Sequence, residues 1–117
     1  MRVEQISQSL TVKEVRPSAW FITCRAASPS DDAIESIQDA CLNALDRGAL
    51  IVAVDLSRFE AISTNAIGVF AVISEMLAAR GGRLWLVWPQ GGAEGNYRVL
   101  SFDGGSRLEF EQMLGGN

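Results

Sequence analysis

The chain has 117 residues, enough for one compact domain but too few for two, since domains typically span roughly 100–150 residues. With 48% hydrophobic and 21% charged residues, its composition is that of a folded globule. The absence of histidine excludes Ser-His triads, histidine acid–base catalysis and zinc sites that contain histidine. The net charge of −4 and the scattered positions of the ten basic residues argue against nucleic-acid binding.

The two cysteines, Cys24 and Cys41, form no CxxC pair, so we expect buried thiols rather than a metal or redox site. The first ten residues lack the apolar stretch of a signal peptide, and no apolar run has the length of a transmembrane helix. We therefore expect a cytoplasmic protein without membrane insertion. We also expect no catalytic, metal or cofactor site, and hence a protein that is not an enzyme.

The first part of the chain predicts a hairpin followed by a helix. Residues 9–15 alternate apolar and polar side chains, as in a half-buried strand, and residues 19–25 are rich in β-branched and aromatic types. Between them, residues 16–18 contain proline and serine and predict the turn. A helix should begin after Ser28 as its cap and end at Gly48, because apolar side chains recur between them at helical spacing.

The middle of the chain predicts a strand, a helix and a second strand. Residues 49–56 are an almost continuous aliphatic run, which is typical of a strand covered on both faces. After a link at residues 57–63, a helix is expected over 65–79 and a buried strand over 84–88. This order favours parallel strands joined by right-handed crossovers. We expect all three tryptophans in the core: Trp20, Trp85 and Trp88.

The last quarter of the chain leaves two alternatives open. Residues 94–102 favour a short helix followed by an edge strand at 107–110, but residues 99–102 could instead pair with 107–110 in a hairpin across an Asp-Gly turn. The glycine-rich loop at 91–95 lacks the Lys-Ser/Thr ending of a phosphate-binding loop, so no nucleotide site is expected there.

The most informative segment is the junction between the aliphatic strand and the second helix. Ser63, Thr64 and Asn65 are three consecutive residues that can cap a helix, which is more than one helix needs. The helix that follows is apolar on nearly all sides, so it must bury more than one face, within its own fold or against another protein. We expect its first two turns to form part of a docking surface.

This pattern resembles the STAS domain of bacterial anti-sigma factor antagonists. The resemblance lies in an aliphatic strand that ends in Asp55-Leu56-Ser57, a hydroxyl-bearing helix start, a glycine two residues into an aliphatic helix, then Gly-Gly and a further aliphatic strand, over residues 49–89. It implies a single STAS domain over residues 1–117. The implied α/β fold has a mixed four- to five-stranded sheet, with an N-terminal antiparallel hairpin and then parallel strands, packed with three to four helices.

In that family the helix start usually reads Asp-Ser-Ser-Gly-Leu-Gly, and a partner kinase phosphorylates the first serine. Here the family's aspartate falls on Ser63, the phosphorylated serine on Thr64 and the second serine on Asn65. The two glycines fall on Ala66 and Gly68, so the hydroxyl and the second glycine are kept. The resemblance implies that Thr64 is the phosphoacceptor, with Ser63 as the fallback. The alternative from the residues alone is that this triplet only caps a helix.

The resemblance also implies a partner. The unmodified domain would bind a histidine-kinase-like ATPase, an anti-sigma factor or serine kinase, in a partner-switching pathway, and a phosphatase would restore it after phosphorylation. The alternative is a non-phosphorylated STAS scaffold subunit, for example of a lipid-transport ABC complex. The residues expected to contact the partner surround the helix start: Asp55, Ser57, Arg58, Ser63, Thr64, Asn65, Ile67 and Gly68.

Overall fold

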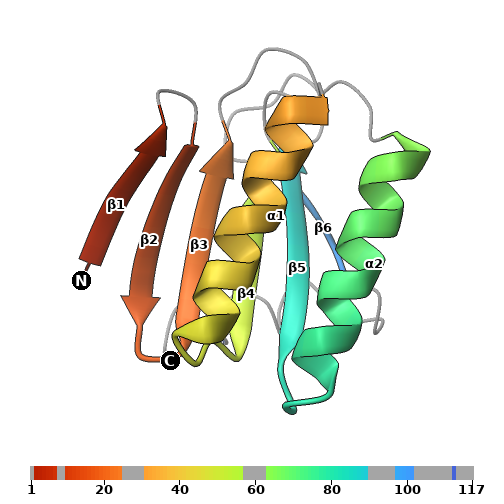
Figure 1. Cartoon of the computed structure of the whole chain (residues 1–117). Helices are drawn as coiled ribbons and strands as arrows, with labels where there is room; N and C mark the ends of the chain where they lie inside the picture. The colour runs from red at the N-terminus through yellow and green to blue at the C-terminus, as the bar shows by residue number, and fades with distance from the viewer. Residues whose placement is uncertain are drawn as a thin grey trace.

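The computed structural model describes six parts of the chain: residues 2–7, 10–24, 31–56, 63–89, 97–101 and 112. Its helices and strands follow in this order: β1 (Arg2–Ser7), β2 (Leu10–Arg16), β3 (Ala19–Cys24), α1 (Asp31–Asp46), β4 (Ile51–Asp55), α2 (Thr64–Ala78), β5 (Arg83–Pro89) and β6 (Tyr97–Leu100). In Figure 1 the strands stand side by side with the two helices in front of them.

The strands form one mixed sheet in which spatial order follows chain order, from β1 to β6. β1, β2 and β3 pair antiparallel, whereas β3, β4 and β5 pair parallel. The predicted α/β architecture, an antiparallel hairpin that leads into parallel strands, is therefore confirmed. The parallel pairs are the ones bridged by helices, as crossover connections require.

Both ends of the sheet differ from the prediction. Within the described residues the sheet has six strands rather than four to five, because β1 precedes the predicted hairpin and β6 follows β5. β6 occupies residues 97–100, where a helix was favoured, so that prediction was wrong. There the backbone pairs antiparallel with β5, and Val99 lies opposite Val87. Sheet pairing has therefore decided the conformation of a segment too short to show a clear period.

The helix expected from Ser28 to Gly48 is observed as α1, and the one expected over 65–79 as α2. These are the two helices of the described residues, against three to four expected, and neither is long and apolar enough to cross a membrane. Ser28, the 91–95 loop and the strand proposed at 107–110 lie outside the described residues. Gly48 follows α1 with φ of +89°, a left-handed conformation that glycine adopts without a steric cost, so its predicted role is confirmed.

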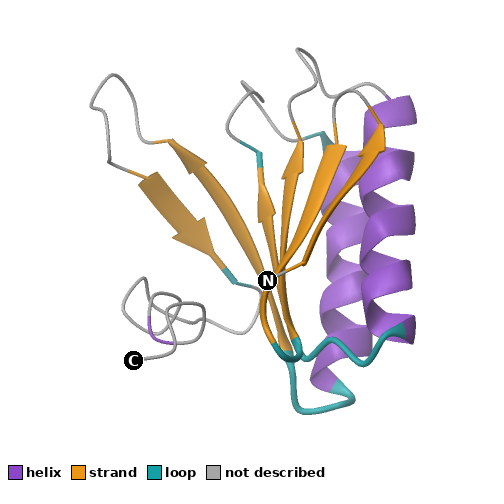
Figure 2. Cartoon of the chain, turned by 90° about the vertical axis from the view of Figure 1, so that its left-hand side faces the viewer, coloured by secondary structure: helices purple, strands orange, loops and turns teal. Residues whose placement is uncertain are grey.

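Both helices cover the same face of the sheet (Figure 2). The main core lies between these layers, and its side chains come from β2 to β5 and from the inner faces of both helices. It includes the two cysteines, both fully buried as predicted, and Trp20. A smaller cluster of Ala53, Trp85 and Val87 is buried on the opposite face. Trp20 and Trp85 are thus core residues as expected, whereas the side chain of Trp88 lies outside the description.

Candidate functional site

The two helices begin at the same edge of the sheet, the edge at which the parallel strands end (Figure 1). Asp55 closes β4 at this edge, and Ser63 and Thr64 start α2 there. In open α/β sheets this edge is the usual place for binding sites, because it gathers strand ends, loops and helix N-termini. The predicted site residues therefore fall on the edge that the architecture favours.

Ser63 caps α2. Its backbone is extended, with φ of −72° and ψ of 160°, and its Oγ accepts a hydrogen bond of 3.1 Å from the backbone N–H of Ala66. Its carbonyl oxygen accepts from the N–H of Ile67 at 3.0 Å. This is the standard N-cap arrangement, in which one side-chain oxygen satisfies a backbone donor of the first turn. The capping role expected from the triplet thus belongs to Ser63.

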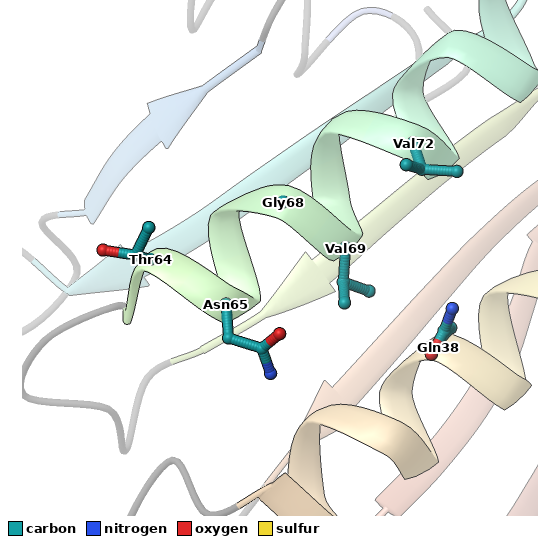
Figure 3. Close-up of a pocket in the computed structure, with 6 residues that line it drawn as sticks. All are labelled: Gln38, Thr64, Asn65, Gly68, Val69 and Val72. Carbon is teal, nitrogen blue, oxygen red and sulfur yellow. The ribbon is translucent and has the colours of Figure 1, made fainter.

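Thr64 and Asn65 are the first two residues of the helix, and both are exposed. In Figure 3 the hydroxyl of Thr64 points away from the other labelled residues, whereas the amide of Asn65 points toward α1. Because the cap uses the oxygen of Ser63, the hydroxyl of Thr64 is not needed to start the helix. An enzyme or a partner protein can therefore reach this hydroxyl without opening the fold.

A groove runs between α1 and α2 from this helix start. One hollow of about 400 Å³ is lined by Gln38 of α1 and by residues of α2, all drawn in Figure 3: Thr64, Asn65, Gly68, Val69 and Val72. A second hollow of about 400 Å³ shares Gln38, Asn65 and Val69 with the first. It extends along α1 to Ile34, Glu35, Asp39 and Leu42. We call these two hollows the α1–α2 groove.

Three large apolar side chains of α2 are exposed, and one of them, Val72, lines the groove. Ile67 is 47% exposed, Val72 54% and Met76 40%, although large apolar side chains of this kind are usually buried. Thr64, Gly68, Val72 and Met76 are spaced four residues apart, so they follow one line along the helix, here called the α2 stripe. A side-chain carbon added at Gly68 would meet nothing within 4 Å, so packing within the chain does not require this glycine.

The structure brings most of the predicted partner-binding residues together. Ser63, Thr64, Asn65, Ile67 and Gly68 are all exposed on the first turns of α2. Asp55 lies at the same sheet edge, is half-buried and already takes part in an interaction within the chain. The other two, Ser57 and Arg58, lie outside the described residues.

Sequence reasoning missed the contribution of α1. Gln38, Glu35 and Asp39 line the groove, but in the sequence, polar residues opposite the apolar positions of a helix indicate only a solvent-exposed face. Their spacing, three and four residues apart, showed that they share a face, but the sequence could not show that α2 lies beside it. Within the described ranges, no three acidic or cysteine side chains gather closely enough to hold a metal ion.

Comparison with curated proteins and with solved structures gave no significant match. The family model described as STAS domain matches residues 21–104, which is more than half of the chain. The matched region runs from β3 through β6 and therefore includes both helices and the whole α1–α2 groove. On this match, with which the mixed α/β sheet agrees, the chain belongs to the STAS-domain family.

Proposed function

We propose that this STAS domain is a partner-switching antagonist that acts in the cytoplasm. Unmodified, it binds a histidine-kinase-like ATPase, an anti-sigma factor or serine kinase, through the start of α2, and so releases that ATPase's other client. Phosphorylation of Thr64 ends the complex, and a phosphatase restores it. The protein is not an enzyme in this scheme. Its own contribution is the surface that the ATPase binds and modifies.

One observation carries the proposal: an exposed hydroxyl, not used by the helix cap, lies at the head of an exposed apolar stripe. A phosphoacceptor must be accessible to a kinase, and its modification must alter a contact with the partner. Thr64 meets the first condition by its exposure and the second by its place in the α2 stripe. Gly68, one turn further, lets a partner's backbone come close to the helix, because glycine has no side chain.

A phosphate on Thr64 would not disturb the fold. It adds a charge of about −1.5 to −2 at pH 7. At a helix N-terminus the first-turn N–H groups and the helix dipole favour an anion, and the first turn of α2 contains no acidic residue that would repel it. The phosphate therefore acts on the complex, through its bulk and through repulsion from acidic groups of the partner.

The first test is modification. The protein is incubated with ATP and with each histidine-kinase-like ATPase of the same organism, and its intact mass is measured. We expect a single added phosphate, absent from Thr64→Ala and still present on Ser63→Ala. A chain that takes no phosphate at either residue would contradict the switching mechanism.

The second test is binding to the ATPase that modifies the protein. Thr64→Glu should weaken the complex by roughly tenfold or more, equal to about 1.4 kcal/mol, whereas Thr64→Ala should keep the affinity of the unmodified protein. Thermal unfolding of Thr64→Glu should match that of the parent chain, since the added carboxylate lies at the favourable end of the helix dipole. Equal affinities for the two variants would exclude a charge-driven release.

The scaffold alternative, a STAS subunit that docks permanently on an ATPase such as that of a lipid-transport complex, is supported by the departures from the family motif. Ser63 occupies the family's aspartate position and acts as the helix cap, and Ala66 replaces a glycine and is buried. A scaffold needs the α2 stripe but not the phosphate. Stable binding to a transporter ATPase, combined with no modification of Thr64, would favour this function.

A further inference from the structure

Within their bounds, the two helices carry charge of one sign. Neither α1 nor α2 contains a lysine or an arginine, whereas α1 exposes Asp32, Glu35, Asp39 and Asp46. Two of these carboxylates, Glu35 and Asp39, line the α1–α2 groove together with Asn65 and Val69. The groove therefore has one acidic wall.

Beyond Thr64 and Asn65 at its start, the other wall is apolar. Val69 is half-buried in the groove, and Val72 and Met76 are exposed along the α2 stripe. At Gly68 the wall has a gap, because no side chain fills the space above this residue. In Figure 3 Gln38, on α1, faces Val69 and Asn65 across the groove. An occupant would thus meet an apolar surface on one side and carboxylates on the other.

This combination selects one kind of occupant. An amphipathic helix can lie in a groove with its apolar side chains against the apolar wall, spaced three and four residues apart. Its flanking residues would then face Glu35 and Asp39, so lysine or arginine is favoured there, and acidic flanks would be repelled. A second copy of this chain fits less well, because the arginines next to its helices, Arg47 and Arg80, lie beyond the C-terminal ends and already contact the Trp20 ring and the carbonyl oxygen of Leu45.

We propose that the α1–α2 groove receives a cationic amphipathic helix of the partner protein. The inference deepens the proposed function, because it states which element of the partner binds α2 and what selects it. It does not depend on phosphorylation: the carboxylates that select the partner helix lie on α1, whereas Thr64 lines the groove only at the start of α2, and its hydroxyl points away from the other lining residues.

Two synthetic peptides provide the test. Both are amphipathic helices about five turns long with the same leucine and phenylalanine stripe; one has lysine and arginine on its flanks and the other has glutamate and aspartate. Each is titrated into the isotope-labelled protein, and amide chemical shifts are followed. The cationic peptide should bind more tightly than the acidic one by tenfold or more. Its binding should shift the amide signals of residues 34–42 and 65–76, and its affinity should fall as salt is added.

Charge reversal of the acidic wall gives the sharpest variant. Glu35→Lys combined with Asp39→Lys should invert the preference, so that the acidic peptide binds more tightly. Asp46→Lys is the matched control: it removes an exposed carboxylate of the same helix that does not line the groove, and it should leave the preference unchanged.

Gly68→Ala separates binding from folding. Its methyl group enters open space, and alanine favours helix more than glycine does, so the midpoint of thermal unfolding should rise. The same methyl group narrows the groove and should lower the affinity for the cationic peptide. A weaker peptide complex in a more stable protein cannot be explained by misfolding.

Three results would overturn the inference: equal affinity for the two peptides, shifts confined to residues outside the groove, or self-association through α2 that excludes both peptides. None of these involves a kinase or ATP. A failure here would therefore leave the phosphorylation of Thr64 standing, and a failure of that modification would leave the peptide preference standing.

Discussion

The burial of the Cys41 side chain could be predicted from the sequence. It lies at an inward position of α1 and has no exposed surface. Burial away from water raises the pKa of its thiol from 9.0 to about 12, because desolvation penalises the thiolate. The absence of a CxxC pair and the helical spacing of its apolar neighbours had already indicated a buried, unreactive thiol.

This pKa shift predicts how stability depends on pH. Between pH 9 and about pH 12 the thiol of the unfolded chain ionises while the folded thiol stays protonated, so ionisation favours unfolding. The free energy of unfolding should fall in this range with a limiting slope of about 1.4 kcal/mol per pH unit from this one group. Below pH 9 the group should contribute no slope.

Urea unfolding at a series of alkaline pH values checks this, with Cys41→Ala as the comparison. The variant should be less stable below pH 9, because it loses buried contacts, but its stability should fall less steeply above pH 9. Parallel curves for the two proteins would mean that the thiol ionises equally in the folded and unfolded chains.

Other residues could not be assigned without the fold. Glu35 and Asp39 had the pattern of a solvated helix face, which they are, and only the position of α2 makes them a wall of the groove. The prediction that Thr64 is the phosphoacceptor came from the family resemblance alone, since three capping residue types in a row do not reveal which one caps. The hydrogen bond from Ala66 to Ser63 resolves that choice.

At the scale of whole elements, α2 was predicted within one residue at each end, because a hydroxyl cap and a pair of glycines enclose a long apolar run. The second glycine of the pair is also required by space. A side-chain carbon at Gly82 would overlap the carbonyl oxygen of Leu50, so the backbone at Gly82 could not lie as close to the backbone at Leu50. β1 was missed and β6 was misassigned, since neither segment shows a clear alternating pattern and each, among the described strands, is partnered on one side.

The division of roles at the start of α2 can be tested by substitution. Ser63→Ala removes the oxygen that accepts from Ala66 and should lower the free energy of unfolding by about 1 kcal/mol. Thr64→Ala removes an exposed hydroxyl that the cap does not use, so its effect should stay within about 0.5 kcal/mol. Chemical unfolding followed by circular dichroism measures both. A larger loss of stability for Thr64→Ala than for Ser63→Ala would show that Ser63 is not the residue that caps the helix.

For the molecule as a whole, the sequence predicted the antiparallel and parallel pairing of the strands but not the extent of the sheet. Alternation, an aliphatic run and a strand–helix–strand order sufficed for a hairpin that leads into parallel strands. The number of strands depends on pairings at the two edges, where β6 joins β5 through contacts such as Val99 with Val87. Such long-range pairings leave little trace in a local pattern.

The sheet should also exchange its amide hydrogens from the edges inward. β4 lies between two parallel neighbours, and Val52, Ala53 and Val54 have no exposed surface, so its amides should exchange only through global unfolding. In the described part of the chain β1 and β6 have one neighbour each, and they should exchange earlier by local opening. Native-state hydrogen exchange monitored by NMR measures this order. Protection of β1 equal to that of β4 would indicate that the sheet opens as one unit.

The separation of the helix cap from the adjacent exposed hydroxyl has an evolutionary consequence. Because Ser63 alone starts the helix, position 64 can change without loss of folding. A single nucleotide change can turn a threonine codon into one for alanine or serine. Under the proposed function, descendants of such a gene could therefore lose or regain a covalent control point while the fold persists, which would allow regulated and permanently attached versions to diverge from one ancestor.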